Sequence, residues 1–306
     1  MALLRILLFF SLMAAWSAGA EDSGPSEPER LPLSSLITEV PRTSWNTLKF
    51  AFQRDSVPAW TGIIISTALL YQYDGDIYAG AQKNGRDWGI GNEDRTKTVM
   101  KMGPYPILRL PSDTGSTLYF LGDGWTHFGT SAAFFLYGQL SESNRAFNTG
   151  LQIFHGMIVS TFFNQALKRG TGRESPSDRT VERGVWRPFP SVRAYSSNTP
   201  KYDAFPSGHV MTATLTFETI RMNYPEYSSY ILPLEVLWLT ALSWQMVNNG
   251  VHWASDYPLA VAMGWAVAKM SVQMGRPDAD KQVASSWTIL PSFSELGPQM
   301  NLVYAF

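Results

Sequence analysis

The chain has 306 residues, of which 45% are hydrophobic and 16% charged. It can therefore bury a large core and is too apolar for a disordered protein. A formal net charge of -1 provides no basic field that would recruit nucleic acid. With no cysteine and only four histidines, disulfides and thiolate chemistry are excluded, and neither a metal site nor a cofactor is expected.

The N-terminus has the pattern of a secretion signal. Arg5 precedes a short apolar run, residues 6–15, and Ala18-Gly19-Ala20 supplies small residues for cleavage. The run is shorter than a membrane span requires. We expect residues 1–20 to be a cleaved signal peptide and the protein to be exported to a bacterial periplasm. An uncleaved N-terminal anchor is the alternative.

Six apolar segments with helical character follow in the chain. Residues 21–45 are rich in Pro, Ser and Glu, so we expect an extended lead-in over residues 21–55. Two irregular stretches, residues 72–114 and 170–205, are expected to be mainly loops. The predicted helices are Ala59–Tyr71, Leu118–Leu140, Thr149–Leu167, Gly208–Asn223, Tyr230–Val247 and Trp253–Met274.

The sequence predicts an all-α fold: a compact helical bundle of about six main helices with long loops. The mean hydropathy is -0.10, and polar residues such as Asn164 and Glu218 interrupt the apolar segments. Both facts favour helices buried in a bundle over helices that span a membrane, with one face able to contact a membrane. The helical domain is expected over residues 56–280, followed by a short extended tail at residues 281–306.

Pro206-Ser207-Gly208-His209 lies between a loop and an apolar helical run. Proline suits a first helical turn, Ser207 can cap the helix, and Gly208 allows the backbone to approach an anion. The unpaired N–H groups of a helix N-terminus would then bind phosphate, with His209 beside it. An ordinary capped helix with a surface histidine is the alternative.

A second candidate pair is His252 and Asp256. Four residues apart on a helix, they would share a face, so Asp256 could accept a hydrogen bond from one ring nitrogen of His252. The other nitrogen would remain as a nucleophile or base. A third group, Lys168 and Arg173, follows a predicted helix and could clamp a phosphate. A structural polar pair and a solvated basic loop are the respective alternatives.

Taken in order, these stretches resemble the signature of the type 2 phosphatidic acid phosphatase and vanadium haloperoxidase superfamily. That signature is Lys-(six residues)-Arg-Pro, then Pro-Ser-Gly-His, then Ser-Arg-(five residues)-His-(three residues)-Asp. Lys168 and Pro176 keep the spacing of the first part, the second is complete, and His252 and Asp256 keep the end of the third. The resemblance suggests a soluble, periplasmic bacterial member.

The resemblance implies a double displacement. His252 would attack phosphorus to form a phosphohistidine while Asp256 orients the ring. His209 would protonate the leaving oxygen and later activate water. The phosphoryl oxygens would be held by Lys168, Ser207 and the backbone N–H of Gly208. The substrate would be a phosphate monoester or pyrophosphate, on a lipid or on a small soluble molecule.

Two arginines of the family signature are missing. Ser175 replaces the first, with Arg173 two positions earlier as a stand-in, and Gln245-Met246 replaces the Ser-Arg pair. Three interpretations follow: a phosphatase, a vanadate-dependent haloperoxidase, or a degenerate member that binds a phosphate-bearing ligand or has a structural role in the envelope. The missing arginines disfavour tight vanadate binding. The number of cations around the site discriminates between the other two.

Overall fold

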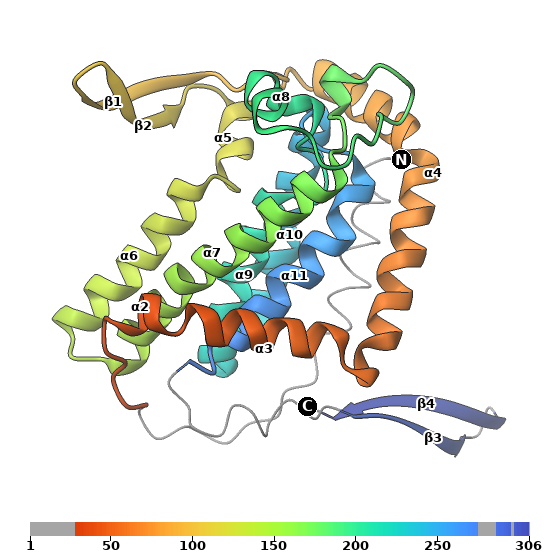
Figure 1. Ribbon diagram of the computed structural model, residues 1–306. Helices are drawn as coiled ribbons and strands as arrows, with labels where there is room; N and C mark the ends of the chain where they lie inside the picture. The colour runs from red at the N-terminus through yellow and green to blue at the C-terminus, as the bar shows by residue number, and fades with distance from the viewer. Residues whose placement is uncertain (1–27, 275–285, 295–296, 306) are drawn as a thin grey trace.

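The computed structural model describes residues 28–274, 286–294 and 297–305. The expected signal peptide, residues 1–20, lies outside this part of the chain, so its cleavage and the export of the protein stay predictions. The described residues are mostly helical, as predicted (Figure 1). They form more α-helices than the six expected: α2 (Ser35–Thr38), α3 (Val40–Phe52), α4 (Val57–Asp87), α5 (Thr114–Phe120), α6 (Gly124–Leu140), α7 (Asn144–Thr171), α8 (Val192–Ser197), α9 (Gly208–Asn223), α10 (Ser228–Asn248) and α11 (Tyr257–Ser271).

The expected extended lead-in is largely helical, which corrects the prediction. Pro41 occupies the first turn of α3, where its missing N–H leaves no hydrogen bond unmade. Thr43, Thr47 and Phe50 recur at helical spacing and are buried, because α3 lies across one end of the bundle and packs on α7 and α11 (Figure 1). The tertiary contact therefore overrides a local composition that suggests extended chain.

The stretch 72–114, expected to be mainly loop, is also more ordered than predicted. Helix α4 continues to Asp87 because Ile77, Tyr78 and Ala81 bury one face of its second half. An antiparallel hairpin follows, formed by β1 (Thr96–Met102) and β2 (Tyr105–Pro111). At the C-terminus, the expected extended tail is a second antiparallel hairpin, β3 (Ser286–Ser294) with β4 (Gly297–Ala305).

Glycines allow α6 and α7 to pack at close range. A Cβ on Gly138 would lie 2.2 Å from the backbone nitrogen of Phe147, and one on Gly150 would lie 2.6 Å from that of Phe135. Both distances are shorter than any real Cβ contact, so a larger residue would push the two helices apart. Helix α7 begins with a side-chain cap from Ser143 and ends at Gly172, which adopts a left-handed conformation with φ of 56°.

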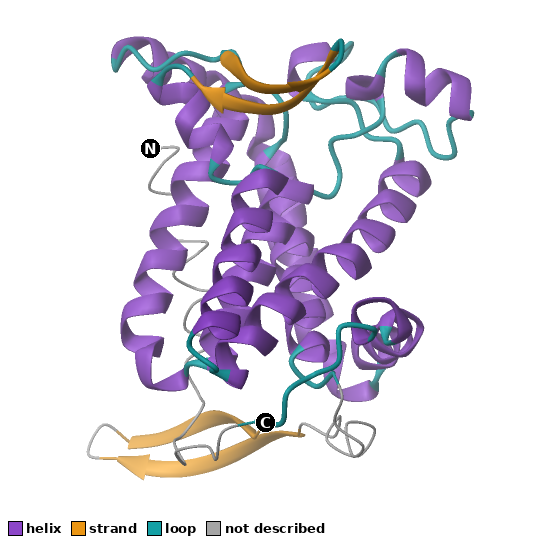
Figure 2. Ribbon diagram, turned by 90° about the vertical axis from the view of Figure 1, so that its left-hand side faces the viewer, coloured by secondary structure: helices purple, strands orange, loops and turns teal. Residues whose placement is uncertain are grey.

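Helices α7, α10 and α11 pack against α9, and α7 also packs against α11. The first residues of α9 lie at the same end of the bundle as α5, α8 and the β1–β2 hairpin (Figure 1). Figure 2 shows the two hairpins at opposite ends of the helical bundle. The long stretch 170–205 is irregular, as predicted, apart from α8 and short 3-10 turns. Within the described residues, one helical stretch, Pro225–Asn248, is long and apolar enough to cross a membrane, and half of its most apolar window is buried in the bundle.

Candidate active site

The candidate site lies where the N-terminus of α9 meets the connection between α10 and α11. The rings of His209 and His252 face each other with their centroids 6.2 Å apart. The backbone N–H of Ser207 donates to the carbonyl of Asp256 at 3.2 Å, which ties the two segments together. The structure therefore brings together residues 43 or more positions apart that the sequence had marked separately.

The ring of His252 is held by a backbone carbonyl. Its Nδ1 lies 2.5 Å from the carbonyl oxygen of Ala204, and because a carbonyl only accepts, Nδ1 carries the proton. The lone pair is then on Nε2. Burial, reinforced by the charge of Lys168, lowers the pKa of His252 to about 3, so the ring is neutral near pH 7.

Asp256 does not orient His252 in the way the sequence predicted. Its Oδ2 is 3.6 Å from Nδ1 of His252, and it accepts instead from the backbone N–H of Trp253 at 2.7 Å. The two residues do not share a helical face, because Trp253 is extended with ψ of 157° and starts a 3-10 turn, Ala254–Asp256. The carbonyl of Ala204 takes the orienting role that was expected of Asp256.

Arg173 is also placed differently from its expected role as a phosphate clamp. It is 1% exposed, and its Nη1 donates to Asp256 and to Ser255, the latter at 2.7 Å. Its Nη2 donates to Asp74 of α4 at 2.7 Å. Both terminal nitrogens therefore bind the protein, and Arg173 positions Asp256 beneath the site.

Asp74 is the residue of this cluster that sequence reasoning missed. It is fully buried on α4, and it accepts from the hydroxyl of Ser255 at 2.5 Å and from the backbone N–H of Ser255 at 3.1 Å. Burial raises the pKa of Asp74, and the charge of Arg173 opposes that shift. Asp74 could have been recognised as a charged residue on the same helical face as the apolar Ile77 and Tyr78. It was not, because residues 72–114 were expected to be mainly loop.

At the start of α9, the prediction of a capped helix is confirmed. The side chain of Ser207 accepts from the backbone N–H of Val210 at 3.4 Å. A Cβ on Gly208 would lie 2.6 Å from Nδ2 of Asn164, so the absence of a side chain lets the helix end approach α7. Burial, with smaller effects of His252 and Lys168, lowers the pKa of His209 to about 3.

Lys168 reaches the site from the last turn of α7, but its ammonium group is already paired with Asp203. Its Nζ donates to the carbonyl of Asp203 at 2.7 Å and pairs with the Asp203 carboxylate at 2.9 Å. Tyr195 donates to the other oxygen of that carboxylate at 2.5 Å. An acidic side chain thus lies on the lysine that was expected to hold a phosphoryl group.

Neither position at which the resembled signature has an arginine is filled by a cation. Ser175 is buried and its backbone N–H donates to Pro200. Met246 is fully buried in the main apolar cluster, and its carbonyl accepts from the backbone N–H of His252 at 3.4 Å. Among the described residues, no group of three or more His, Asp or Glu side chains is arranged to hold a metal ion.

The two histidines make the stability of the protein dependent on pH. In the unfolded chain they take up protons below about pH 6.5, whereas in the folded chain they stay neutral down to about pH 3. The free energy of unfolding therefore decreases as the pH is lowered from 6.5 to 3. Burial raises the pKa of Asp256 from 3.8 to about 6. As the pH is lowered, the folded chain therefore protonates this carboxyl before the unfolded chain does, which offsets part of the loss. These three groups together contribute a net loss of roughly 2–3 kcal/mol between pH 7 and pH 5, and His127, whose pKa burial lowers to about 4, adds to the total.

Thermal or denaturant unfolding at the two pH values would measure this loss. In His209→Asn, which lacks one of the two titrating rings, the loss should shrink by roughly 2 kcal/mol. An identical pH dependence in wild type and His209→Asn would contradict the explanation.

One comparison with known proteins gave a match. The family model of the PAP2 superfamily matches residues 149–278, a range that includes α7, α9, α10 and α11 and each predicted site residue. Asp74 lies outside the matched range. No significant match was found among curated proteins or among solved structures.

Proposed function

We propose that the protein is a phosphatase that cleaves a phosphate monoester or a pyrophosphate through a phosphohistidine on His252. The observation that carries the proposal is the neutral ring of His252, protonated on Nδ1 by its bond to Ala204 and facing His209 at a helix N-terminus. The match of residues 149–278 to the PAP2 superfamily supports phosphatase-type chemistry on a phosphorylated substrate.

The reaction balances in two steps. Nε2 of His252 attacks phosphorus, the bond from phosphorus to the leaving oxygen breaks, and that oxygen takes a proton. Water then attacks phosphorus, the P–N bond breaks and phosphate leaves. His209 would give and take the proton. A bound phosphate dianion would raise its pKa from the low value of the empty site, because an opposite charge favours the protonated ring.

Trapping the intermediate tests the proposal. The purified full chain would be mixed with p-nitrophenyl phosphate and, separately, with lipid phosphates and pyrophosphate, and phosphate release would be measured. Reactions stopped in alkali should contain a phosphorylated peptide that includes residue 252 and that loses its phosphate in acid, as a phosphohistidine does. A folded protein that neither releases phosphate from any of these substrates nor becomes phosphorylated would refute the proposal.

One observation favours a second candidate, a degenerate member that binds a phosphate-bearing ligand without turnover. Lys168 is paired with Asp203, and Arg173 is paired with Asp74 and Asp256, so the two cations near the site face three carboxylates. A phosphate dianion must compete with Asp203 for Lys168. If the folded protein binds inorganic phosphate but forms no phosphohistidine with any of these substrates, it has this second function.

Replacing Asp203 with asparagine should strengthen substrate binding. The isosteric amide keeps an acceptor for Tyr195 but removes the charge that occupies Lys168, which should lower KM roughly tenfold if the lysine contacts the phosphoryl group. Asp178→Asn, on the same loop, is the matched control and should leave KM unchanged. An unchanged KM in Asp203→Asn would show that Lys168 does not bind substrate.

A further inference from the structure

The outer faces of four helices of the bundle carry no charged side chain. The segments concerned are residues 57–71 of α4, 124–140 of α6, 161–167 of α7 and 229–237 of α10, and their exposed residues are named here the apolar belt. A water-soluble bundle normally places charged side chains on the outward face of each helix. The belt instead exposes large apolar residues, among them Ile64, Ile65, Leu69, Trp125, Phe128, Leu136, Tyr137, Phe162, Tyr230, Leu234 and Leu237.

The interior of the bundle is more polar than this outer surface. Helix α7 buries Asn148, Gln152 and Asn164, together with several Ser, Thr and His side chains of neighbouring helices, while Phe162 on its outer face is 65% exposed. This distribution contributes to the low mean hydropathy of the chain, together with the charged loops. Averaging over a whole helix mixes a polar inner face with an apolar outer one, so the average understates how apolar the surface is.

Charged residues gather at the two ends of the bundle. One end holds the candidate site, the β1–β2 hairpin and the basic stretch that follows α7, and the other holds α3 and the turn between α6 and α7 (Figure 1). Between the ends, α6 runs for 17 residues without an Asp, Glu, Lys or Arg. At 1.5 Å per residue this is about 25 Å, close to the thickness of the hydrocarbon core of a bilayer.

The belt lies on several sides of the bundle. Helices α4 and α6 are on opposite sides in Figure 1, with α10 between them, so one protein partner docked on one face could not cover it. Helix contacts through small residues fit the same surroundings: a Cβ on Gly264 of α11 would lie 2.5 Å from the carbonyl of Met211 on α9. Close backbone contact of this kind is a means of association for helices surrounded by lipid.

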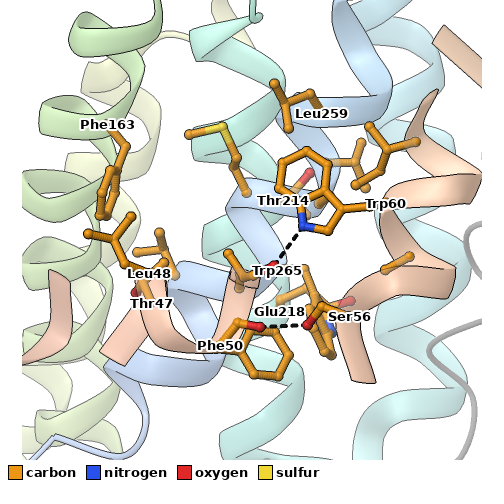
Figure 3. A pocket seen from close by; sticks show the side chains of 18 of the residues that line it. Thr47, Leu48, Phe50, Ser56, Trp60, Phe163, Thr214, Glu218, Leu259 and Trp265 are labelled. Carbon is orange, nitrogen blue, oxygen red and sulfur yellow. Dashed lines mark hydrogen bonds between the residues drawn. The ribbon is translucent and has the colours of Figure 1, made fainter. Parts of the chain in front are cut away.

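An apolar groove opens between α3–α4 and the core helices (Figure 3). It encloses about 350 Å³ and is lined by Phe50, Trp60, Leu259 and Trp265, among others. Glu218, at its wall, is paired with Arg221. Water would fill such a groove at a free-energy cost, whereas a hydrocarbon chain from surrounding lipid would fill it without one.

We propose that the helical bundle is embedded in a lipid bilayer, with the apolar belt facing the acyl chains and the candidate active site at one membrane surface. The proposal stands independently of whether the site hydrolyses phosphate. It replaces the sequence-based expectation of a soluble bundle with at most one face on a membrane. Helix α3, which lies across the opposite end and exposes Trp45 and Phe52, would then lie in the other interface.

Cysteine labelling tests the proposal cleanly, because the chain has no cysteine of its own. Single-cysteine variants of the full chain, Leu136→Cys and Leu234→Cys in the belt and Val192→Cys at the polar end, would be treated in native membranes with a membrane-impermeant, water-soluble maleimide. We expect at least tenfold slower labelling at the two belt positions than at residue 192, and equal labelling after denaturation in detergent. Equal rates in native membranes would overturn the proposal.

A charge placed in the belt provides a second measurement, which an uncleaved N-terminal anchor could not mimic. Ile65 and Val181 are both 54% exposed, but only Ile65 lies in the belt. Ile65→Lys should reduce the yield of folded protein in the membrane fraction several-fold, whereas Val181→Lys should not. If the protein is instead a water-soluble monomer or oligomer once the signal is removed, or if both variants accumulate equally, the bilayer proposal is wrong.

Discussion

Phosphate release should fall by on the order of 10⁴-fold or more when His252 is replaced by alanine. The substitution removes the group that we propose accepts the phosphoryl group, and the remaining site can at most bind and polarise the substrate. Because the ring is neutral and buried, its removal leaves no unpaired charge, so the variant should fold. Hydrolysis of p-nitrophenyl phosphate, with circular dichroism and thermal unfolding of the same preparation, would check both expectations.

His209→Ala separates the two steps of the same mechanism. The p-nitrophenolate leaving group needs no protonation, so this variant should still release one equivalent of p-nitrophenolate per protein in a burst. It should then accumulate as the phosphohistidine, because no base activates the water that would hydrolyse it. A variant of His252 that retains turnover, or a His209→Ala variant that shows neither burst nor phosphoenzyme while remaining folded, would contradict the assigned roles.

The second large effect is expected at Arg173. Replacing it with methionine removes the cation between Asp74 and Asp256, two carboxylates that are fully buried, and a buried charge without its partner is destabilising by about 3–5 kcal/mol. The loss should therefore appear as a lower free energy of unfolding, measured by denaturant titration. Arg193→Met, at an exposed position of α8, is the matched control and should be nearly neutral.

A compensating substitution distinguishes charge from packing. Asp74→Asn combined with Arg173→Met removes one of the two unpaired charges and should recover part of the lost stability. If Arg173 bound substrate phosphate instead of positioning Asp256, the single variant would lose affinity for substrate while keeping the stability of wild type, and the double variant would recover nothing.

The helices α7, α9 and α10 and the candidate histidines could be predicted from the sequence because their signals are local. A serine cap, a glycine and an apolar run suffice to place the start of α9, and the order of three short motifs, which contain Lys168, His209 and His252, carries the resemblance. The partners of these residues were not local. Ala204 orients His252 through a backbone carbonyl, and any residue at position 204 would offer the same group, so no side-chain pattern could reveal it.

The amino-acid sequence by itself determined that the protein is mostly helical and where α9 begins, and it selected His209 and His252 as the candidate site residues. Tertiary structure alone decided that Arg173 binds Asp74 across 99 positions of sequence, that Asp203 occupies Lys168, and that residues 40–52 form a helix. It also decided which face of each helix points outward. The composition of a helix averages its inner and outer faces. Only the packing of the helices shows which residues lie on each face, and so reveals an apolar surface around a polar interior.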